Sequence, residues 1–158
     1  MKVFFLSLFI VLTLVAQGFA ESPVKYNKEL DGFKYPFEVN TFKFNSQNQD
    51  LKMRYMDIAK KDSQKVIVLL HGKNFSGYYW ERVAKDLLKK NYRVIIPDQI
   101  GFGKSSKPDY YQYSFGQLAL NTKTLLDNLK IAKGGGPQKL DNVLSYESDH
   151  ATGGSDDG

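Results

Sequence analysis

The sequence has 158 residues, two histidines, no cysteine and a formal net charge of +5 at neutral pH. The absence of cysteine excludes disulfides and a lipidated N-terminal cysteine. The basic residues before position 134 are scattered among aromatic and acidic residues, whereas residues 134–158 are acidic. This pattern favours a solvated lysine-rich surface over a basic stripe that binds nucleic acid, so we expect no nucleic-acid partner.

The first twenty residues predict a secretory signal peptide. Met1 and Lys2 form a short positive start, residues 3–16 are almost wholly apolar, and Gly18-Phe19-Ala20 provides a cleavage site with small residues. The apolar core is too short to span a bilayer comfortably, and the alternative is an uncleaved N-terminal anchor. We therefore expect a secreted or periplasmic protein that begins at Glu21 and has no stable membrane anchor after cleavage.

The elements that follow begin with a predicted β-hairpin. Apolar and aromatic residues stand at near-alternate positions in Phe37–Phe44 and Leu51–Ile58, on either side of the polar turn NSQNQD. The continuous apolar run Val66–Leu70 predicts a strand that is buried on both faces. Residues 80–88 have apolar side chains at helical spacing, and Asn91 is suited to end that helix in a left-handed conformation.

A second strand and helix complete the predicted domain. Tyr92–Ile96 is another apolar run, and Ser114 with Gln117 forms a capping box for a helix. The residues expected on the apolar face of that helix are Phe115, Leu118, Ala119, Thr122, Leu126 and Leu129. A hairpin followed by strand, helix, strand, loop and helix predicts an α/β domain with a partly parallel sheet over residues 21–133.

The pattern stops after Lys133. Residues 134–158 are rich in glycine, serine and aspartate, so we expect a disordered or out-of-frame tail. A frame change, a misjoined read or an artificial junction explains this break better than a natural tail does. The expected next strand, and a Gly-x-Ser-x-Gly motif behind it, would then lie in another reading frame. Without that strand, Val66–Leu70 is expected to be an exposed sheet edge.

The stretch DQIGFGKSS, residues 98–106, invites a nucleotide-binding interpretation. A P-loop would require glycine where Asp98 stands, and this carboxylate would repel a phosphate. The dinucleotide motif G-x-G-x-x-G fails because Ser106 replaces its last glycine. A nucleotide-binding domain therefore stays a weaker alternative. The sequence favours Asp98, Gly101 and Gly103 as turn-forming residues, with Asp98 accepting backbone hydrogen bonds in an Asx-type turn.

The chemistry is expected in the loop His71-Gly72-Lys73-Asn74, which directly follows the strand Val66–Leu70. Glycine at a strand end lets the chain turn sharply and aim successive backbone N–H groups at one point. Such preorganised N–H groups stabilise the oxyanion that develops in acyl transfer.

A family resemblance supports this interpretation. The segment VIVLLHGKNFSGYYWERVAKDLLKKNYRVIIPDQIGFGKSSKP, followed by YQYSFGQLALNTKTLLDNLKI, resembles the N-terminal part of α/β-hydrolase fold enzymes. The resemblance extends from about Phe37 to Lys133. It implies hydrolysis of an ester, amide, epoxide, carbon–halogen or carbon–carbon bond in a small-molecule substrate, with no cofactor and no metal. It also implies that Lys73 lends its backbone N–H to the oxyanion hole and that His71 is structural; Asn74 stands where the family often has proline.

The nucleophile of the fold has no counterpart in the sequence. No serine has glycine both two residues before and two residues after it, as the nucleophile elbow requires. The grouping of Ser155, His150 and Asp149 is interpreted as chance, and Ser76 with His71 lacks a third group that would orient a base. We therefore expect no catalytic nucleophile, acid or histidine, and an inactive polypeptide as given. The leading hypothesis is the N-terminal part of an exported hydrolase; the alternative is a non-catalytic binding protein on a hydrolase-like scaffold.

Overall fold

A computed structural model describes residues 24–59, 63–131 and 139–145. The predicted signal peptide lies outside these residues. The elements are β1 (Val39–Ser46), β2 (Gln49–Ile58), β3 (Lys65–Leu70), the 3-10 helix η1 (Gly77–Trp80), α2 (Glu81–Lys89), β4 (Tyr92–Pro97), α3 (Phe115–Asn128) and β5 (Lys139–Ser145). The strands form one sheet in the order β1-β2-β4-β3-β5. None of the helices within the described ranges is long and apolar enough to cross a membrane.

The predicted hairpin is confirmed. β1 pairs antiparallel with β2, from Val39 opposite Met56 to Ser46 opposite Gln49. The two residues of the turn, Gln47 and Asn48, have φ angles of 50° and 58°. Two left-handed residues in succession match the twist of a two-residue hairpin turn.

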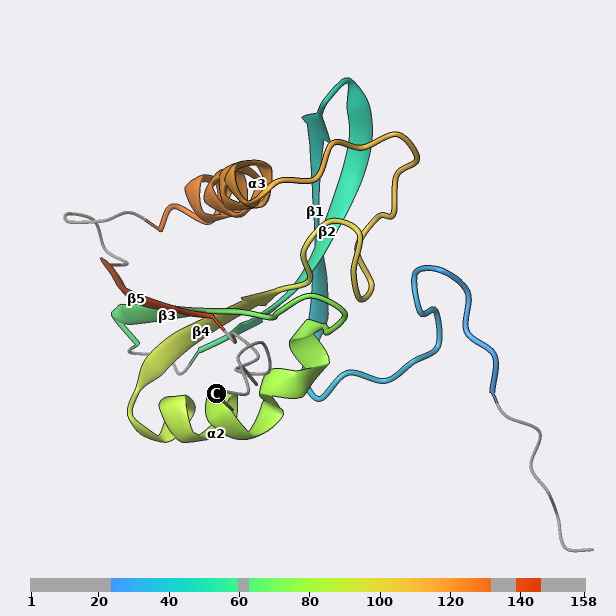
Figure 1. Ribbon diagram of the computed structural model, residues 1–158. Coiled ribbons are helices and arrows are strands. Elements are labelled where there is room, and N and C mark those ends of the chain that lie inside the picture. The colour runs from blue at the N-terminus through green and yellow to red at the C-terminus, as the bar shows by residue number, and fades with distance from the viewer. Residues whose placement is uncertain (1–23, 60–62, 132–138, 146–158) are drawn as a thin grey trace, which may run out of the picture.

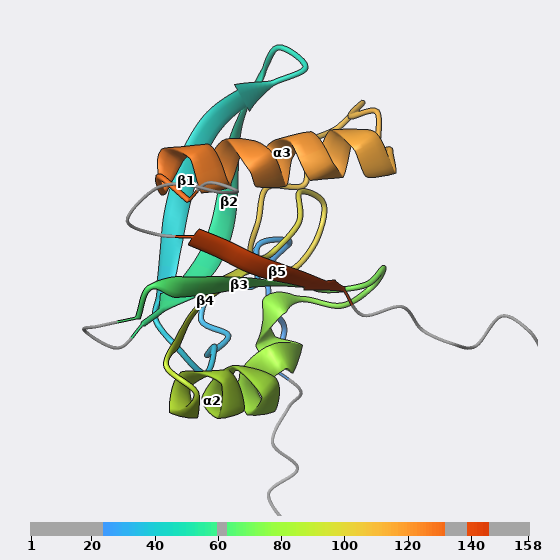
Figure 2. The ribbon, with the colours of Figure 1, turned by 90° about the vertical axis from the view of Figure 1, so that its left-hand side faces the viewer.

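The centre of the sheet is mixed, as the order of elements predicts. β4 pairs antiparallel with β2 and parallel with β3, with Lys65 opposite Tyr92 and Val68 opposite Ile95. α2 covers one face of the sheet and α3 covers the other (Figures 1 and 2). The central strands are therefore buried on both faces, which explains their continuous apolar sequences.

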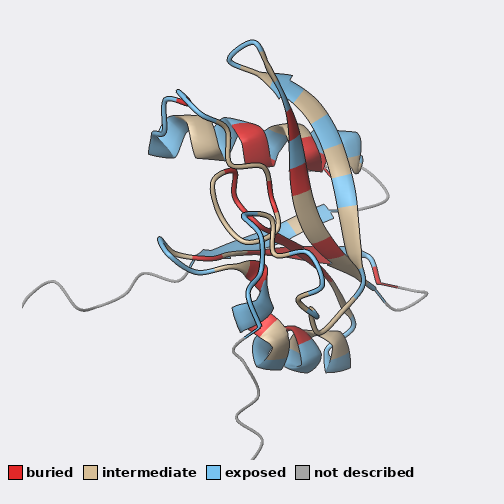
Figure 3. Ribbon diagram, turned by 90° about the vertical axis from the view of Figure 1, so that its right-hand side faces the viewer, coloured by how far each residue is buried: buried red, intermediate tan, exposed pale blue. Residues whose placement is uncertain are grey.

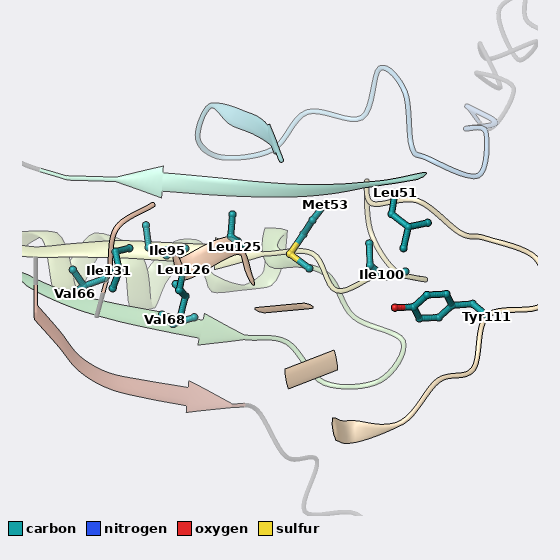
Figure 4. Close-up of a cluster of buried hydrophobic side chains, with 10 residues drawn as sticks. All are labelled: Leu51, Met53, Val66, Val68, Ile95, Ile100, Tyr111, Leu125, Leu126 and Ile131. Atoms are coloured by element: carbon teal, nitrogen blue, oxygen red, sulfur yellow. The ribbon is translucent and has the colours of Figure 1, made fainter. Parts of the chain in front are cut away.

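Two apolar clusters stabilise the two faces, and the strands carry much of the buried surface (Figure 3). The cluster on the α3 side, drawn in Figure 4, contains Leu51, Met53, Val66, Val68, Ile95, Ile100, Tyr111, Leu125, Leu126 and Ile131. The cluster on the α2 side contains Met56, Ile67, Leu69, Trp80, Ala84, Val94 and Ile96. Alternate residues of β3 and β4 thus point into opposite clusters.

The inward face of α3 differs in part from the prediction. Thr122 and Leu126 are buried as expected, but Phe115 is 94% exposed and Ala119 is exposed as well. Phe115 is the first residue of the helix, before the inward stripe reaches the core. Asn121 and Leu125 are buried instead. The side chain of Asn121 donates to the Tyr111 hydroxyl at 2.9 Å, so this polar residue is hydrogen-bonded within the core. Asn121 was not predicted because the buried face was assigned from the spacing of apolar residues.

The prediction of a disordered tail after Lys133 is wrong for residues 139–145. These residues form β5, which pairs parallel with β3, from Lys65 opposite Lys139 to Leu70 opposite Ser145. β3 is therefore an interior strand and not an exposed edge. Backbone pairing explains the outcome, because the free edge of β3 presents N–H and C=O groups that a polar strand satisfies as well as an apolar one. Residues 132–138 and 146–158 lie outside the described residues.

Candidate active site

Two loops meet at one edge of the sheet. We call residues 71–76, which follow β3, the His-Gly loop, and residues 98–106, which follow β4, the glycine loop. Because β3 and β4 are parallel, their carboxyl ends lie at the same edge. The backbone N–H of Gln99 donates to Nε2 of His71 at 2.9 Å, which joins the two loops directly. The sequence predicted both loops, and the structure brings them together.

His71 links the backbone of these loops. Its Nε2 accepts from Gln99, so the ring proton must lie on Nδ1, which is 2.9 Å from the carbonyl oxygen of Gly72 and donates to it. Burial lowers the pKa of His71 below its ordinary value, which favours this neutral form. Both ring nitrogens are thus engaged by the backbone. This geometry supports a structural role and gives no support to a Ser76–His71 catalytic pair.

The His-Gly loop contains a tight turn at Lys73 and Asn74. The N–H of Phe75 donates to the carbonyl of Gly72 at 3.2 Å, which closes the turn over the two residues between them. Asn74 has a φ angle of 67°, a left-handed conformation that asparagine tolerates. Proline, with φ fixed near −65°, cannot adopt it. Lys73 is exposed, and the residue after it is asparagine where the family often has proline.

The carboxylate of Asp98 connects three separate segments of the chain. Its side chain is 1% exposed. Oδ1 accepts from the N–H of Gly77 at 2.6 Å, and Oδ2 accepts from the N–H of Lys104 and the hydroxyl of Tyr35, both at 2.7 Å. The sequence predicted a local Asx-type turn at Asp98. The three donors instead come from separate places in the chain: Lys104 in the glycine loop, Gly77 after the His-Gly loop, and Tyr35 near the N-terminus. Asp98 therefore fixes the two loops relative to each other.

Gly103 is shaped to this carboxylate. Its φ angle is +49°, and a Cβ atom at this position would lie 2.2 Å from Oδ2 of Asp98. Gly101, with a φ angle of +94°, donates its N–H to the carbonyl of Ser106 at 2.8 Å. The two glycines thus serve as the turn-forming residues of a compact loop, one of them through close approach to Asp98.

The polar side chains of the glycine loop are used within the protein. Ser105 is fully buried; its Oγ donates to the carbonyl of Asp98 at 2.6 Å and accepts from the N–H of Arg54 at 2.8 Å. The ammonium of Lys104 donates to the carbonyl of Leu30, and that of Lys107 donates to the carbonyl of Gly103. These contacts leave the Gly-Lys-Ser sequence without the geometry of a phosphate cradle, which requires its N–H groups and lysine to converge on one anion.

Tyr35 belongs to this site, although no sequence pattern indicated it. Burial, and next the negative charge of Asp98, raise the pKa of the Tyr35 phenol well above its ordinary value. The hydroxyl therefore stays protonated and donates to Asp98. In the sequence Tyr35 belongs to the stretch YPF, which by its composition indicates only apolar packing. The polar partner of Tyr35 is evident only in the folded structure.

A cleft of about 280 Å³ lies beside the His-Gly loop. It is lined by Leu30, Asn74, Phe75, Ser76, Tyr78, Tyr79 and Gly103, so both loops contribute to its wall. Within the described part of the chain, no group of three or more histidine and acidic side chains could hold a metal ion. The proposed chance grouping of Ser155, His150 and Asp149 lies outside the described residues.

Comparison with known proteins identifies the class of protein. Residues 65–134 match the family model described as alpha/beta hydrolase fold. A probable hydrolytic enzyme from Pseudomonas aeruginosa PAO1, solved as a crystal structure, superposes with a TM-score of 0.69 at 45% identity over 77% of this chain and 37% of that chain. A cis-3-alkyl-4-alkyloxetan-2-one decarboxylase from Xanthomonas campestris is 38% identical over 51% of this chain, and a haloalkane dehalogenase from Mycobacterium marinum is 34% identical over 52%.

The match to the alpha/beta hydrolase fold covers residues 65–134, and the chain corresponds to only a part of each relative. It spans 29% of the decarboxylase and 28% of the dehalogenase. The resemblance inferred from the two loop motifs is thereby confirmed. The relatives differ in the bond they act on, so the family sets the scaffold and leaves the substrate to the individual site.

Proposed function

We propose that this chain provides the oxyanion-stabilising part of an exported α/β hydrolase that cleaves an ester, an amide or a related bond in a small molecule. The observation that carries the proposal is the His-Gly loop, which is held at the carboxyl edge of the sheet by the His71–Gln99 hydrogen bond and by Asp98. In this proposal the backbone N–H of Lys73 is the oxyanion donor. A donor held before the reaction costs no reorganisation when negative charge develops.

The remaining parts of the proposal come from the sequence. The apolar N-terminal segment supports export, and the similarity to a haloalkane dehalogenase supports a small-molecule substrate. A sequence without Gly-x-Ser-x-Gly supports the second candidate, a non-catalytic binding protein on the same scaffold. In either case we expect the 158-residue polypeptide to show no turnover of activated esters above buffer.

A chimera tests the oxyanion role. Residues 24–131 replace the matching segment of the Pseudomonas relative, whose 45% identity favours correct packing. The Lys73→Pro variant removes the donor N–H, and the matched Lys73→Ala variant keeps it. Lys73 is the second residue of a β-turn, where proline is well tolerated, so the backbone should stay folded. We expect Lys73→Pro to lower kcat for an activated ester roughly 10²–10³-fold and Lys73→Ala to leave it nearly unchanged.

Three results would contradict the proposal. If Lys73→Pro keeps kcat close to that of Lys73→Ala in a folded chimera, Lys73 is not the donor. If the 158-residue chain alone hydrolyses the ester and Ser76→Ala abolishes the reaction, Ser76 is the nucleophile and the family assignment of roles is wrong. If the chimera is inactive with every bond class while the natural chain binds small molecules, the binding-protein alternative replaces the hydrolase.

A further inference from the structure

The segment 24–37, which we call the N-terminal strap, lies against the region where the His-Gly loop enters η1. This strap runs past the start of η1 and α2 before it enters β1 (Figure 1). Phe33 makes edge-to-face contacts with Tyr26, Tyr35 and Tyr78, at ring-centroid distances of 5.4, 5.9 and 5.2 Å. The aromatic contact with Tyr78 thus joins the strap to the residue that follows Gly77.

Tyr35 reaches the end of the His-Gly loop by two routes. Its ring contacts Tyr78 at a centroid distance of 6.0 Å. Its hydroxyl donates to Oδ2 of Asp98, whose other oxygen accepts from the N–H of Gly77 at 2.6 Å. Hydrogen bonds to a buried carboxylate are short and strong, because the charge has no water to solvate it. The orientation of the Asp98 carboxylate therefore depends on all three of its donors.

We propose that Tyr35 is a positioning residue: its hydroxyl fixes the carboxylate of Asp98, which in turn holds Gly77 and anchors the end of the His-Gly loop. The consequence for catalysis rests on the function proposed for Lys73, but the positioning itself does not. Without the hydroxyl, Oδ2 keeps only the N–H of Lys104, and the carboxylate can rotate away from Gly77. The amides of Gly77 and Lys104 then open to solvent more often.

Other contacts also attach the N-terminal strap to the protein. The effect of the Tyr35 hydroxyl on Asp98 can therefore be measured without detaching the strap. The ammonium of Lys104 donates to the carbonyl of Leu30 at 2.8 Å and lies 5.3 Å from the centre of the Tyr35 ring. Lys52 forms an ion pair with Glu29 at 3.4 Å. Replacing Tyr35 by phenylalanine keeps the ring, its aromatic contacts and these attachments, and removes the hydroxyl that donates to Asp98.

The test compares Tyr35→Phe with Tyr26→Phe in the 158-residue protein. Tyr26→Phe removes a hydroxyl from the same strap, on a ring that is 43% exposed, and keeps its contact with Phe33. Amide hydrogen exchange followed by NMR reports each N–H separately. We expect exchange at Gly77 and Lys104 to become about tenfold faster in Tyr35→Phe, the effect of one lost hydrogen bond to a charged group. The amides of Val66–Leu69 should keep their wild-type rates in both variants.

The chimera adds a readout that a purely structural role would not move. There we expect Tyr35→Phe to lower kcat severalfold with KM unchanged, because the loop is displaced and not lost. Exchange rates at Gly77 and Lys104 equal to those of Tyr26→Phe would overturn the proposal, as would equal acceleration along Val66–Leu69. An unchanged kcat for Tyr35→Phe would also overturn it in a chimera whose kcat falls with Lys73→Pro. A failure of the oxyanion role is recognised separately, by a Lys73→Pro chimera that keeps its kcat.

Discussion

Substituting Gly103 by alanine should be among the most damaging single-methyl additions in this chain. The φ angle of +49° imposes left-handed strain on alanine, about 1–2 kcal/mol. The added Cβ would stand 2.2 Å from Oδ2 of Asp98, so the carboxylate must move. Moving it breaks at least one hydrogen bond to a buried charge, which contributes about 1.5–3 kcal/mol. We therefore expect a loss of about 2.5–5 kcal/mol in the free energy of unfolding.

Gly32 provides the matched control. It has a φ angle of +80°, but a Cβ atom there would meet nothing within 4 Å. Gly32→Ala should therefore cost only the strain, about 1–2 kcal/mol. Urea denaturation measures both variants, with the slope of the transition expected to stay unchanged. If Gly103→Ala costs no more than Gly32→Ala, the carboxylate of Asp98 is not held where the structure places it. A double-mutant cycle with Asp98→Ala should recover much of the excess cost.

Four further measurements test other parts of the structure. Mass spectrometry of exported protein should find Glu21 at the N-terminus, and an intact signal segment would contradict export with cleavage. An NMR titration should give His71 a pKa below the ordinary value of about 6.5. Because the pKa of His71 is lower in the folded state, the unfolded state binds more protons, and the free energy of unfolding falls as the pH drops below about 6.5. A His71 resonance that titrates at the ordinary value would refute the backbone-bonded ring. Ser114→Ala should lower the free energy of unfolding by about 1 kcal/mol, because the serine side chain accepts from the N–H of Gln117 at 3.1 Å. An unchanged urea midpoint would show that this cap does not stabilise the protein. Deleting residues 139–158 should accelerate amide exchange along Val66–Leu69, and unchanged protection there would show that β5 does not pair with β3.

Local sequence signals predicted most of the fold, because each acts over a few residues. The apolar runs of β3 and β4, the helical spacing of α2 and the left-handed Asn91, with a φ angle of 62°, all behave as expected. The capping residue Ser114 does as well, although Gln117 turns its side chain towards Asn121 and not back to the cap. The exact burial of α3 depended on a polar core residue that an apolar pattern does not detect.

The parts that escaped prediction depend on contacts between distant segments. β5 has too few apolar residues to be read as a strand, and it forms because β3 presents an open edge. The expectation that an apolar strand and a Gly-x-Ser-x-Gly motif lie in another reading frame stays a prediction, and the motif is absent from the given sequence. Tyr35 lies 63 residues from Asp98, so their hydrogen bond leaves no mark on either local sequence.

The central claim is that the backbone N–H of Lys73 faces a developing oxyanion. In the chimera carrying residues 24–131, the amide proton of Lys73 can be observed directly by NMR. A trifluoromethyl ketone forms a tetrahedral oxyanion with a serine nucleophile of the fold and is the probe, with the matching methyl ketone as its control. We predict a downfield shift of the Lys73 amide proton with the fluorinated ketone and none with the control. A Lys73 amide that does not move while the fluorinated ketone is bound would contradict the claim.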